Sequence, residues 1–323
     1  MIEISIVIPV YNEALALPAL FQRLYPALDK LGQTYEIIFI NDGSRDRSVA
    51  VLRTQFEARP DVTRVVLLAG NFGQHMAIMA GFEKSRGSTV VTLDADLQNP
   101  PEEIAALIAK IHEGYDYVGS IRRNRQDSFL RRWPSRLINW IRERTTHIKM
   151  TDQGCMLRAY SRGIINAVNN CHEVNTFIPA LAYSFAQNPT EIEVAHEERS
   201  AGESKYSMYK LLRLNFDLMT GFSLAPLQMF SILGIVVSLG TMATYLVVMI
   251  NRWILSGSFW QGLQVMWDRD ILQFFLIGIL LFGLGLLGEY IGRIYQQVRG
   301  RPRFLIDAVL EQRTPEQSST LAK

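Results

Sequence analysis

The sequence predicts an α/β fold with a mostly parallel, Rossmann-like sheet, followed by two transmembrane helices. Short β-branched apolar segments alternate with segments of helical periodicity over about the first 200 residues, which predicts a doubly wound sheet. Two long uncharged apolar runs follow in the C-terminal half. The net charge of +2 over 323 residues says little about partners, so the distribution of hydrophobicity carries the argument.

Each strand is predicted from an apolar, β-branched run that ends in turn-forming residues. The expected strands cover residues 4–10, 35–40, 62–68, 88–93, 115–121 and 190–194, and one more ends at Tyr160. A helix is expected at 14–31, and Asp42 or Ser44 can cap the next one. Pro100 and the acids after it suit the start of another helix. In such sheets ligands bind beyond the carboxyl ends of the strands.

Two aspartates follow the 88–93 strand directly. Asp94 and Asp96 put two carboxylates at the end of a buried strand. Oxygen ligands of this kind suit Mg²⁺ or Mn²⁺, which keep substrate phosphates in their coordination shell. The alternative is a pair of acids in an ordinary surface turn, because Asp-x-Asp arises often by chance.

Two further acids, Glu13 and Asp42, end the first and second strands. Together with Asp94 and Asp96 they predict a nucleotide-sugar site on one rim of the sheet. The turn after the first strand contains no glycine, which disfavours NAD or FAD.

The stretch 122–144 is rich in arginine and carries two tryptophans at Trp133 and Trp140. A basic amphipathic helix with tryptophan is typical of a membrane interface, and we expect one near 128–144. The alternatives are a solvated basic helix packed on the sheet and a nucleic-acid-binding helix, and nucleic acid is not the expected partner. A second interfacial helix is expected near 205–219.

Residues 218–251 and 271–288 contain no charged side chain. Each run can cross a hydrocarbon core of about 30 Å as a helix, and the alternative is a pair of buried core helices. Membrane spans are therefore expected at about 227–250 and 271–290, joined by a short periplasmic loop. Basic residues flank both outer ends, which predicts cytoplasmic termini.

The domain boundaries follow from these segments. A catalytic domain is expected over 1–210, the two spans within 220–290, and a cytoplasmic C-terminal segment over 291–323. The first strand is too short for a signal peptide, so the N-terminal part is expected in the cytoplasm. Cys155 and Cys171 are expected to be free thiols there.

Four motifs resemble the family-2 glycosyltransferases of the GT-A fold. They lie at 7–13 (VIPVYNE), 41–44 (NDGS), 93–102 (LDADLQNPPE) and 202–206 (GESKY). With its two apolar runs, the whole chain resembles the polyprenyl-phosphate glycosyltransferases, the group of dolichol-phosphate mannose synthase and bactoprenol glucosyltransferase. Segments 71–82, 124–128, 152–160 and 285–295 resemble the branch that transfers 4-deoxy-4-formamido-L-arabinose to undecaprenyl phosphate.

The resemblance implies roles for individual residues. Contacts to the UDP-sugar donor are expected from Pro9, Tyr11, Glu13, Asp42 and Gln98. Asp94 and Asp96 are expected to hold the divalent cation, Mg²⁺ or Mn²⁺. Arg122, Arg131 and Lys205 are expected near phosphate groups, and Asp152 is either a base or, as we favour, an orienting partner of an arginine. Arg45 departs from the family, in which a second Ser or Thr is frequent at this position.

The resemblance also implies that the protein transfers the sugar to undecaprenyl phosphate with inversion. It implies a multi-pass protein of the bacterial inner membrane that forms a homotetramer. The process would be lipid A modification and resistance to polymyxin and other cationic antimicrobial peptides. The alternatives are a glucosyl or mannosyl transferase of the same group, and, from another class, a non-catalytic lipid-carrier flippase or scaffold.

Overall fold

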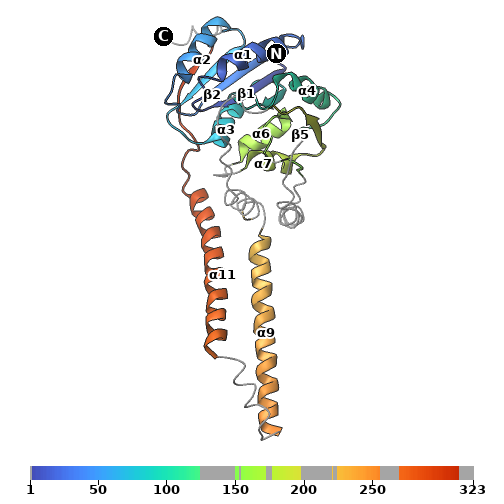
Figure 1. The fold of residues 1–323 in the computed structure, drawn as a ribbon, viewed down its shortest axis with the longest axis vertical. Helices are drawn as coiled ribbons and strands as arrows, with labels where there is room; N and C mark the ends of the chain where they lie inside the picture. The colour runs from blue at the N-terminus through green and yellow to red at the C-terminus, as the bar shows by residue number, and fades with distance from the viewer. Residues whose placement is uncertain are drawn as a thin grey trace. The chain divides into compact units, whose positions relative to one another are not determined.

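The structure is a computed structural model that divides into a globular unit and a helical unit (Figure 1). It describes residues 2–123, 150–152, 154–171, 177–197, 220, 224–254 and 269–312. In the last two ranges the side chains of residues 225, 238, 241, 242, 244–254 and 269–275 are not described. The expected interfacial helices near 128–144 and 205–219 lie outside the described residues.

An eight-stranded sheet forms the centre of the globular unit, in the order β7-β5-β6-β4-β1-β2-β3-β8. The strands are β1 (Ile4–Val10), β2 (Tyr35–Asn41), β3 (Thr63–Leu68), β4 (Thr89–Thr92), β5 (Tyr117–Arg122), β6 (Arg158–Ser161), β7 (Pro189–Val194) and β8 (Ile306–Leu310). The pairs β1/β2, β1/β4, β2/β3 and β5/β7 are parallel. The α/β class and the mostly parallel sheet are therefore confirmed, and β6 and β8 add antiparallel pairs.

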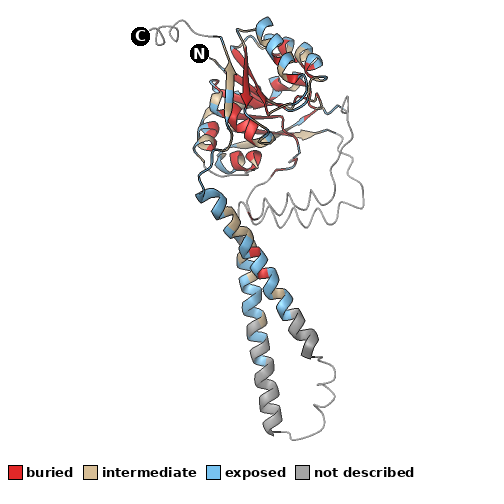
Figure 2. Ribbon diagram, turned by 90° about the vertical axis from the view of Figure 1, so that its left-hand side faces the viewer, coloured by how far each residue is buried: buried red, intermediate tan, exposed pale blue. Residues whose placement is uncertain are grey.

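Helices cover both faces of this sheet. They are α1 (Leu17–Asp29), α2 (Ser48–Ala58), α3 (Gln74–Lys84), η1 (Pro101–Glu103), α4 (Ile104–His112), α6 (Arg162–Asn170) and α7 (Ile178–Phe185). Alternation along β1 separates the faces: Ile6 and Ile8 join a core cluster with apolar residues of α1, α2 and α4. On the other face α3 lies so close that a Cβ at Gly81 would stand 2.3 Å from Val7 Cγ1. Figure 2 shows the buried residues gathered on the sheet and the inner sides of its helices.

The strand β8 was not predicted from the sequence. It pairs antiparallel with β3 and forms the edge of the sheet, so residues after the helical unit return to the globular unit. The sequence around the short apolar run Ile306–Leu310 does not by itself predict a strand. The run is extended because it pairs with β3, which is distant in the sequence.

The helical unit contains α9 (Ala225–Ile254) and α11 (Arg269–Val298), each of 30 residues. Among the described residues one helix, Leu276–Val298, is long and apolar enough to cross a membrane, and a shorter apolar stretch covers Pro226–Val237. The two helices pack closely at one glycine, because a Cβ at Gly283 would stand 2.2 Å from Phe230 Cε1. Small residues such as glycine let two helices approach this closely.

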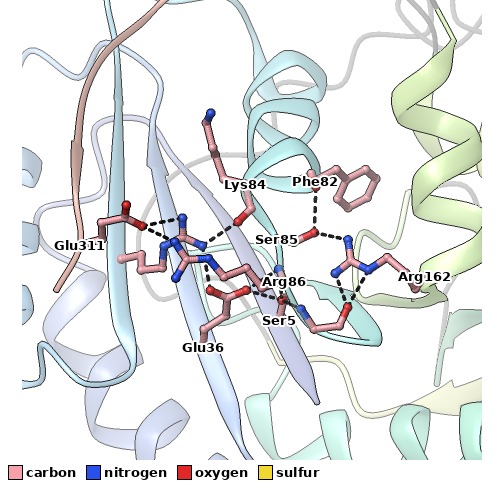
Figure 3. A network of polar contacts seen from close by, with 10 residues as sticks. Ser5, Glu36, Phe82, Lys84, Ser85, Arg86, Arg162 and Glu311 are labelled. Atoms are coloured by element: carbon pink, nitrogen blue, oxygen red, sulfur yellow. Dashed lines mark hydrogen bonds and ion pairs between the residues drawn. The ribbon is translucent and has the colours of Figure 1, made fainter. Parts of the chain in front are cut away.

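A network of charges with a buried ion pair, Glu36–Arg64, at its centre lies at the amino ends of the strands (Figure 3). The Glu36 carboxylate, 2% exposed, accepts hydrogen bonds from Arg64 Nη1 at 2.8 Å and from Ser5 Oγ and the Arg86 backbone N–H, each at 2.6 Å. Arg64 and Arg86 also reach Glu311 Oε2, at 2.9 and 2.7 Å. The network thereby joins the start of β1, β2 and β3 to the residue that follows β8.

Replacement of Glu36 by Gln should lower the free energy of unfolding of the full chain by about 3 kcal/mol. The Arg64 guanidinium then loses its buried counter-charge and keeps only the partly exposed Glu311. Breaking a buried pair from one side costs about 3–5 kcal/mol. Chemical unfolding in detergent, followed by near-UV circular dichroism, measures the change. As a control, Glu113→Gln removes one partner of the exposed Lys110–Glu113 pair and should leave stability unchanged. Equal behaviour of the two variants would contradict the assignment.

Candidate active site

The turns after β1 and β2 are fastened to each other. The Asn12 backbone N–H donates to Ser44 Oγ at 3.0 Å, and the Arg45 N–H donates to Asn12 Oδ1 at 2.8 Å. Asn12 has a φ of 57°, a left-handed conformation that asparagine tolerates better than most residues. Because Arg45 contributes its backbone N–H, this bond does not depend on the side chain by which the sequence departs from the family.

The predicted donor residues Pro9, Tyr11 and Glu13 all lie at the carboxyl end of β1. Pro9 pairs with Ile40 in the parallel ladder, and Tyr11 is 45% exposed just beyond it. The Glu13 N–H donates to Ser48 Oγ at 2.9 Å, which ties this turn to the first residue of α2. An exposed aromatic ring beside a fixed backbone turn is suited to stacking against a nucleobase.

Asp42 is buried and holds the next loop in place. Its Oδ1 accepts from the Phe72 N–H at 2.7 Å, and its Oδ2 accepts from the Gly73 N–H at 2.9 Å. Gly43 (φ 65°) allows the close approach, because a Cβ there would stand 2.5 Å from the Gly70 carbonyl carbon. In this structure Asp42 therefore organises the rim, whatever it also contributes to donor binding.

Asp94 and Asp96 stand where predicted, directly after β4, and both are half-buried. Gln74 Nε2, at the start of α3, donates to Asp94 Oδ1 at 2.7 Å. Asp96 Oδ1 accepts from the Gln98 N–H at 3.1 Å, and Leu97 between them has a φ of 60°. Asp42 holds the backbone just before α3, and Gln74, the first residue of α3, in turn holds the Asp94 carboxylate. Sequence reasoning had missed Gln74.

Asp152 and Arg122 form a two-pronged ion pair. Arg122 Nε donates to Asp152 Oδ2 at 2.6 Å, and Nη2 donates to Oδ1 at 3.0 Å. Asp152 is buried, and Oδ1 also accepts from the Gly154 N–H at 3.0 Å. A Cβ at Gly154 would stand 2.9 Å from Arg122 Nη2, so glycine leaves room for the guanidinium.

Arg158 lies behind this pair and was also missed by sequence reasoning. It is fully buried, and it donates to the backbone oxygens of Asp152 at 2.6 Å and Cys155 at 2.9 Å. Its Nη1 donates to the Tyr117 hydroxyl. A buried guanidinium requires such acceptors, and its bond to the Asp152 carbonyl fixes the backbone that presents the carboxylate.

Two other titratable groups near the rim are neutral at physiological pH. Burial lowers the pKa of His75, next to Gln74, to about 4, and its ring lies edge-on to Phe177 at 5.2 Å between centroids. Burial raises the pKa of the Cys155 thiol to about 11. Neither Cys155 nor Cys171 forms a disulfide, and a protonated thiol is a poor nucleophile.

Arg131 and Lys205 lie outside the described residues, so their predicted roles stay predictions. Within the described part of the chain, no group of three or more His, Cys, Asp or Glu side chains could hold a metal ion. Asp94 and Asp96 still fit Mg²⁺ or Mn²⁺ in kind, because such ions are often bound through one or two carboxylates plus substrate phosphates.

Comparison with known proteins identifies relatives. The family profile described as Glycosyl transferase family 2 matches residues 5–168. Undecaprenyl-phosphate 4-deoxy-4-formamido-L-arabinose transferase of Shewanella sediminis (strain HAW-EB3) is 50% identical over 95% of this chain and 92% of its own length. The protein of the same name from Pseudomonas aeruginosa (strain LESB58) is 49% identical over 95% of this chain and 90% of its own length.

Among solved structures, glucosyl-3-phosphoglycerate synthase from Mycobacterium tuberculosis in complex with Mn²⁺ and uridine-diphosphate-glucose is 16% identical. The match covers 68% of this chain and 77% of that chain, with a TM-score of 0.48. The profile match and the mixed, mostly parallel sheet together support a GT-A-like α/β fold for the globular unit.

Replacement of Asp42 by Asn should destabilise the rim. The amide nitrogen would face one of the two backbone N–H groups, and an unsatisfied buried donor costs about 1–3 kcal/mol. The measurement is the free energy of unfolding together with the affinity for UDP, and both should fall. Asp61→Asn is the control, since Asp61 is 59% exposed in a surface pair with Arg59. Wild-type values for Asp42→Asn would show that the loop does not depend on this carboxylate.

Proposed function

Because the chain belongs to glycosyl transferase family 2, we propose that it transfers 4-deoxy-4-formamido-L-arabinose from a UDP-sugar to undecaprenyl phosphate. The observation that carries the proposal is the 50% identity to a transferase of that name over 95% of this chain. The match covers nearly the full length of both proteins, so it includes the helical unit as well as the catalytic domain. The process served would be lipid A modification and polymyxin resistance.

The reaction proposed is a single displacement with inversion. An oxygen of undecaprenyl phosphate forms a bond to the anomeric carbon, and the bond from that carbon to UDP breaks with its electron pair on UDP. A phosphate monoester carries about −1.5 to −2 charge at neutral pH, so it attacks without a strong general base. The paired state of Asp152 fits this scheme, in which Asp152 orients Arg122.

The rim residues supply donor binding in this proposal. Pro9, Tyr11 and Glu13 would contact the nucleoside from the end of β1, with Asp42 holding the loop beside them and Gln98 following the aspartates. Asp94 and Asp96 would hold a divalent cation, Mg²⁺ or Mn²⁺. When bound, such a cation neutralises charge that develops on the leaving diphosphate.

Arginines and a lysine would hold the two anions against their mutual repulsion. Arg122 is presented at the end of β5 by its pair with Asp152. We place Arg131 and Lys205 with it on the grounds of the family resemblance. Guanidinium groups match phosphate oxygens in a bidentate geometry, which favours arginine at such positions.

The acceptor is a membrane lipid, and the proposal includes a membrane location. Leu276–Val298 meets the length and hydropathy expected of a span, and α9 would form the second. We propose the bacterial inner membrane, a cytoplasmic catalytic domain with both termini on that side, two interfacial helices and a homotetramer.

The proposal is tested with purified full-length protein, undecaprenyl phosphate and a panel of labelled UDP-sugars. Label should move from UDP-4-deoxy-4-formamido-L-arabinose into butanol-extractable lipid, and the product should carry the inverted anomeric configuration. Transfer from UDP-glucose alone would correct the sugar and keep the class. No transfer from any sugar would favour a flippase or scaffold and overturn the proposal.

Replacement of Asp96 by Asn should reduce transfer at least about 100-fold, as expected when charge stabilisation of a leaving group is lost. The Asn oxygen can still accept the Gln98 N–H, so the fold should persist. Chelation by EDTA should abolish sugar transfer by the wild-type enzyme, and added Mn²⁺ or Mg²⁺ should restore the transfer. Asp61→Asn is again the control. Wild-type turnover by Asp96→Asn with either metal would remove Asp96 from the metal site.

A further inference from the structure

The guanidinium of Arg23, on α1, donates hydrogen bonds to two carboxylates from distant parts of the chain. Its Nε and Nη2 donate to Glu102 at 3.0 and 2.9 Å, and its Nη1 and Nη2 donate to Glu197 at 2.9 and 3.0 Å. These are 79 and 174 residues away in sequence. One planar guanidinium therefore joins three segments in a fork geometry that an ammonium group cannot reproduce.

The two carboxylates belong to segments that border the candidate active site. Glu102 lies in η1, shortly after the loop of residues 93–100 that carries the two aspartates. Glu197 follows β7. The Glu197 backbone N–H donates to the Gln98 oxygen at 2.9 Å, and the Ala195 N–H donates to Glu103 Oε1 at 3.2 Å. Arg23 thus reinforces a junction that already includes the 93–100 loop.

This loop depends on such outside support. It contains no helix or strand over 93–100, and Leu97 holds a φ of 60°, which is unfavourable for a leucine. Asp96 is bonded to the Gln98 N–H, so the position of Gln98 sets that of the carboxylate. Ordering a loop costs conformational entropy, and contacts made before substrate binds reduce the cost at the moment of binding.

We propose that Arg23 is a positioning residue for the reaction, which holds Gln98, and through it Asp96, ready for the UDP–metal complex. The inference rests on the proposed function for the meaning of that complex. Arg23 lies on α1 and acts through its hydrogen bonds to Glu102 and Glu197.

The charges favour a local role over a contribution to overall stability. The side chains of Arg23, Glu102 and Glu197 are 32%, 52% and 49% exposed, and exposed ion pairs contribute little to folding. The hydrogen bond from Arg23 lowers the pKa of Glu197, so the carboxylate stays ionised at neutral pH. Removal of Arg23 should therefore loosen the junction while the domain stays folded.

The experiment compares full-length wild type with Arg23→Ala, Arg23→Lys and Glu197→Gln. Arg59→Ala is the matched control, because Arg59 is 34% exposed and pairs with two carboxylates, Asp29 and Asp61, away from the junction. Two readouts are measured in detergent without any sugar donor. They are the affinity for UDP in the presence of Mn²⁺ and the hydrogen–deuterium exchange of the Ala195 and Glu197 amides.

Arg23→Ala should weaken UDP affinity and speed exchange at both amides, each about fivefold to tenfold, since small misplacements at a site have effects of this size or larger. Glu197→Gln should show the same trend, Arg23→Lys a smaller one, and Arg59→Ala none. Unchanged exchange would overturn the proposal. Faster exchange with unchanged UDP affinity would also overturn it, because the junction would then be structural only.

These readouts separate the inference from the proposed function. UDP binding and amide exchange require neither transfer nor a particular sugar. If the wild type transfers no formamido-arabinose while Arg23→Ala still weakens UDP binding, the sugar assignment fails and the role of Arg23 stands. If transfer is found and Arg23→Ala behaves like the control, only the role of Arg23 fails.

Discussion

The parallel pairing of β4, β1 and β2 is the constraint on which the candidate site depends. It brings three strand ends to one edge of the sheet, so that residues far apart in sequence become neighbours. Asp42 is the clearest consequence. Its two oxygens hold the loop that starts α3, and Gln74 of α3 holds Asp94 at the end of β4. The buried Asp42 carboxylate thus links the end of β2 to the loop before α3. The strand arrangement is what places it beside that loop.

Charged side chains are arranged differently at the amino ends and at the carboxyl ends of the strands. At the amino ends, Glu36 and Arg64 are buried and matched, and Glu311 joins them after the chain has passed through the helical unit. Replacing a whole matched pair of this kind by apolar residues is often neutral for stability, whereas removing one partner is strongly destabilising. At the carboxyl ends, Asp94 and Asp96 are half-buried carboxylates beside a predicted phosphate site. Each of these carboxylates accepts a hydrogen bond, Asp94 from Gln74 Nε2 and Asp96 from the Gln98 N–H.

The local elements were predictable because their patterns are local. Apolar strands, a proline with acids at η1 and the Asp-x-Asp pair can be read within a few residues. β8, Gln74, Arg158 and Arg23 could not be read this way. Each owes its role to a partner from elsewhere in the chain, as β8 does to β3 and Arg23 to Glu197. An arginine in an amphipathic helix looks like any solvated charge until the fold places two carboxylates around it.

The geometry of Asp152 bears on how the nucleophile is generated. To accept a proton, this buried carboxylate would have to weaken the two charge-assisted hydrogen bonds that it accepts from Arg122. A base in that state is a poor one. A sugar hydroxyl as acceptor would need a better base, whereas a phosphate monoester, with a second pKa of about 6, is already ionised at neutral pH. The Asp152–Arg122 pair is therefore suited to an acceptor that brings its own negative charge, and it leaves the arginine aligned to meet that charge.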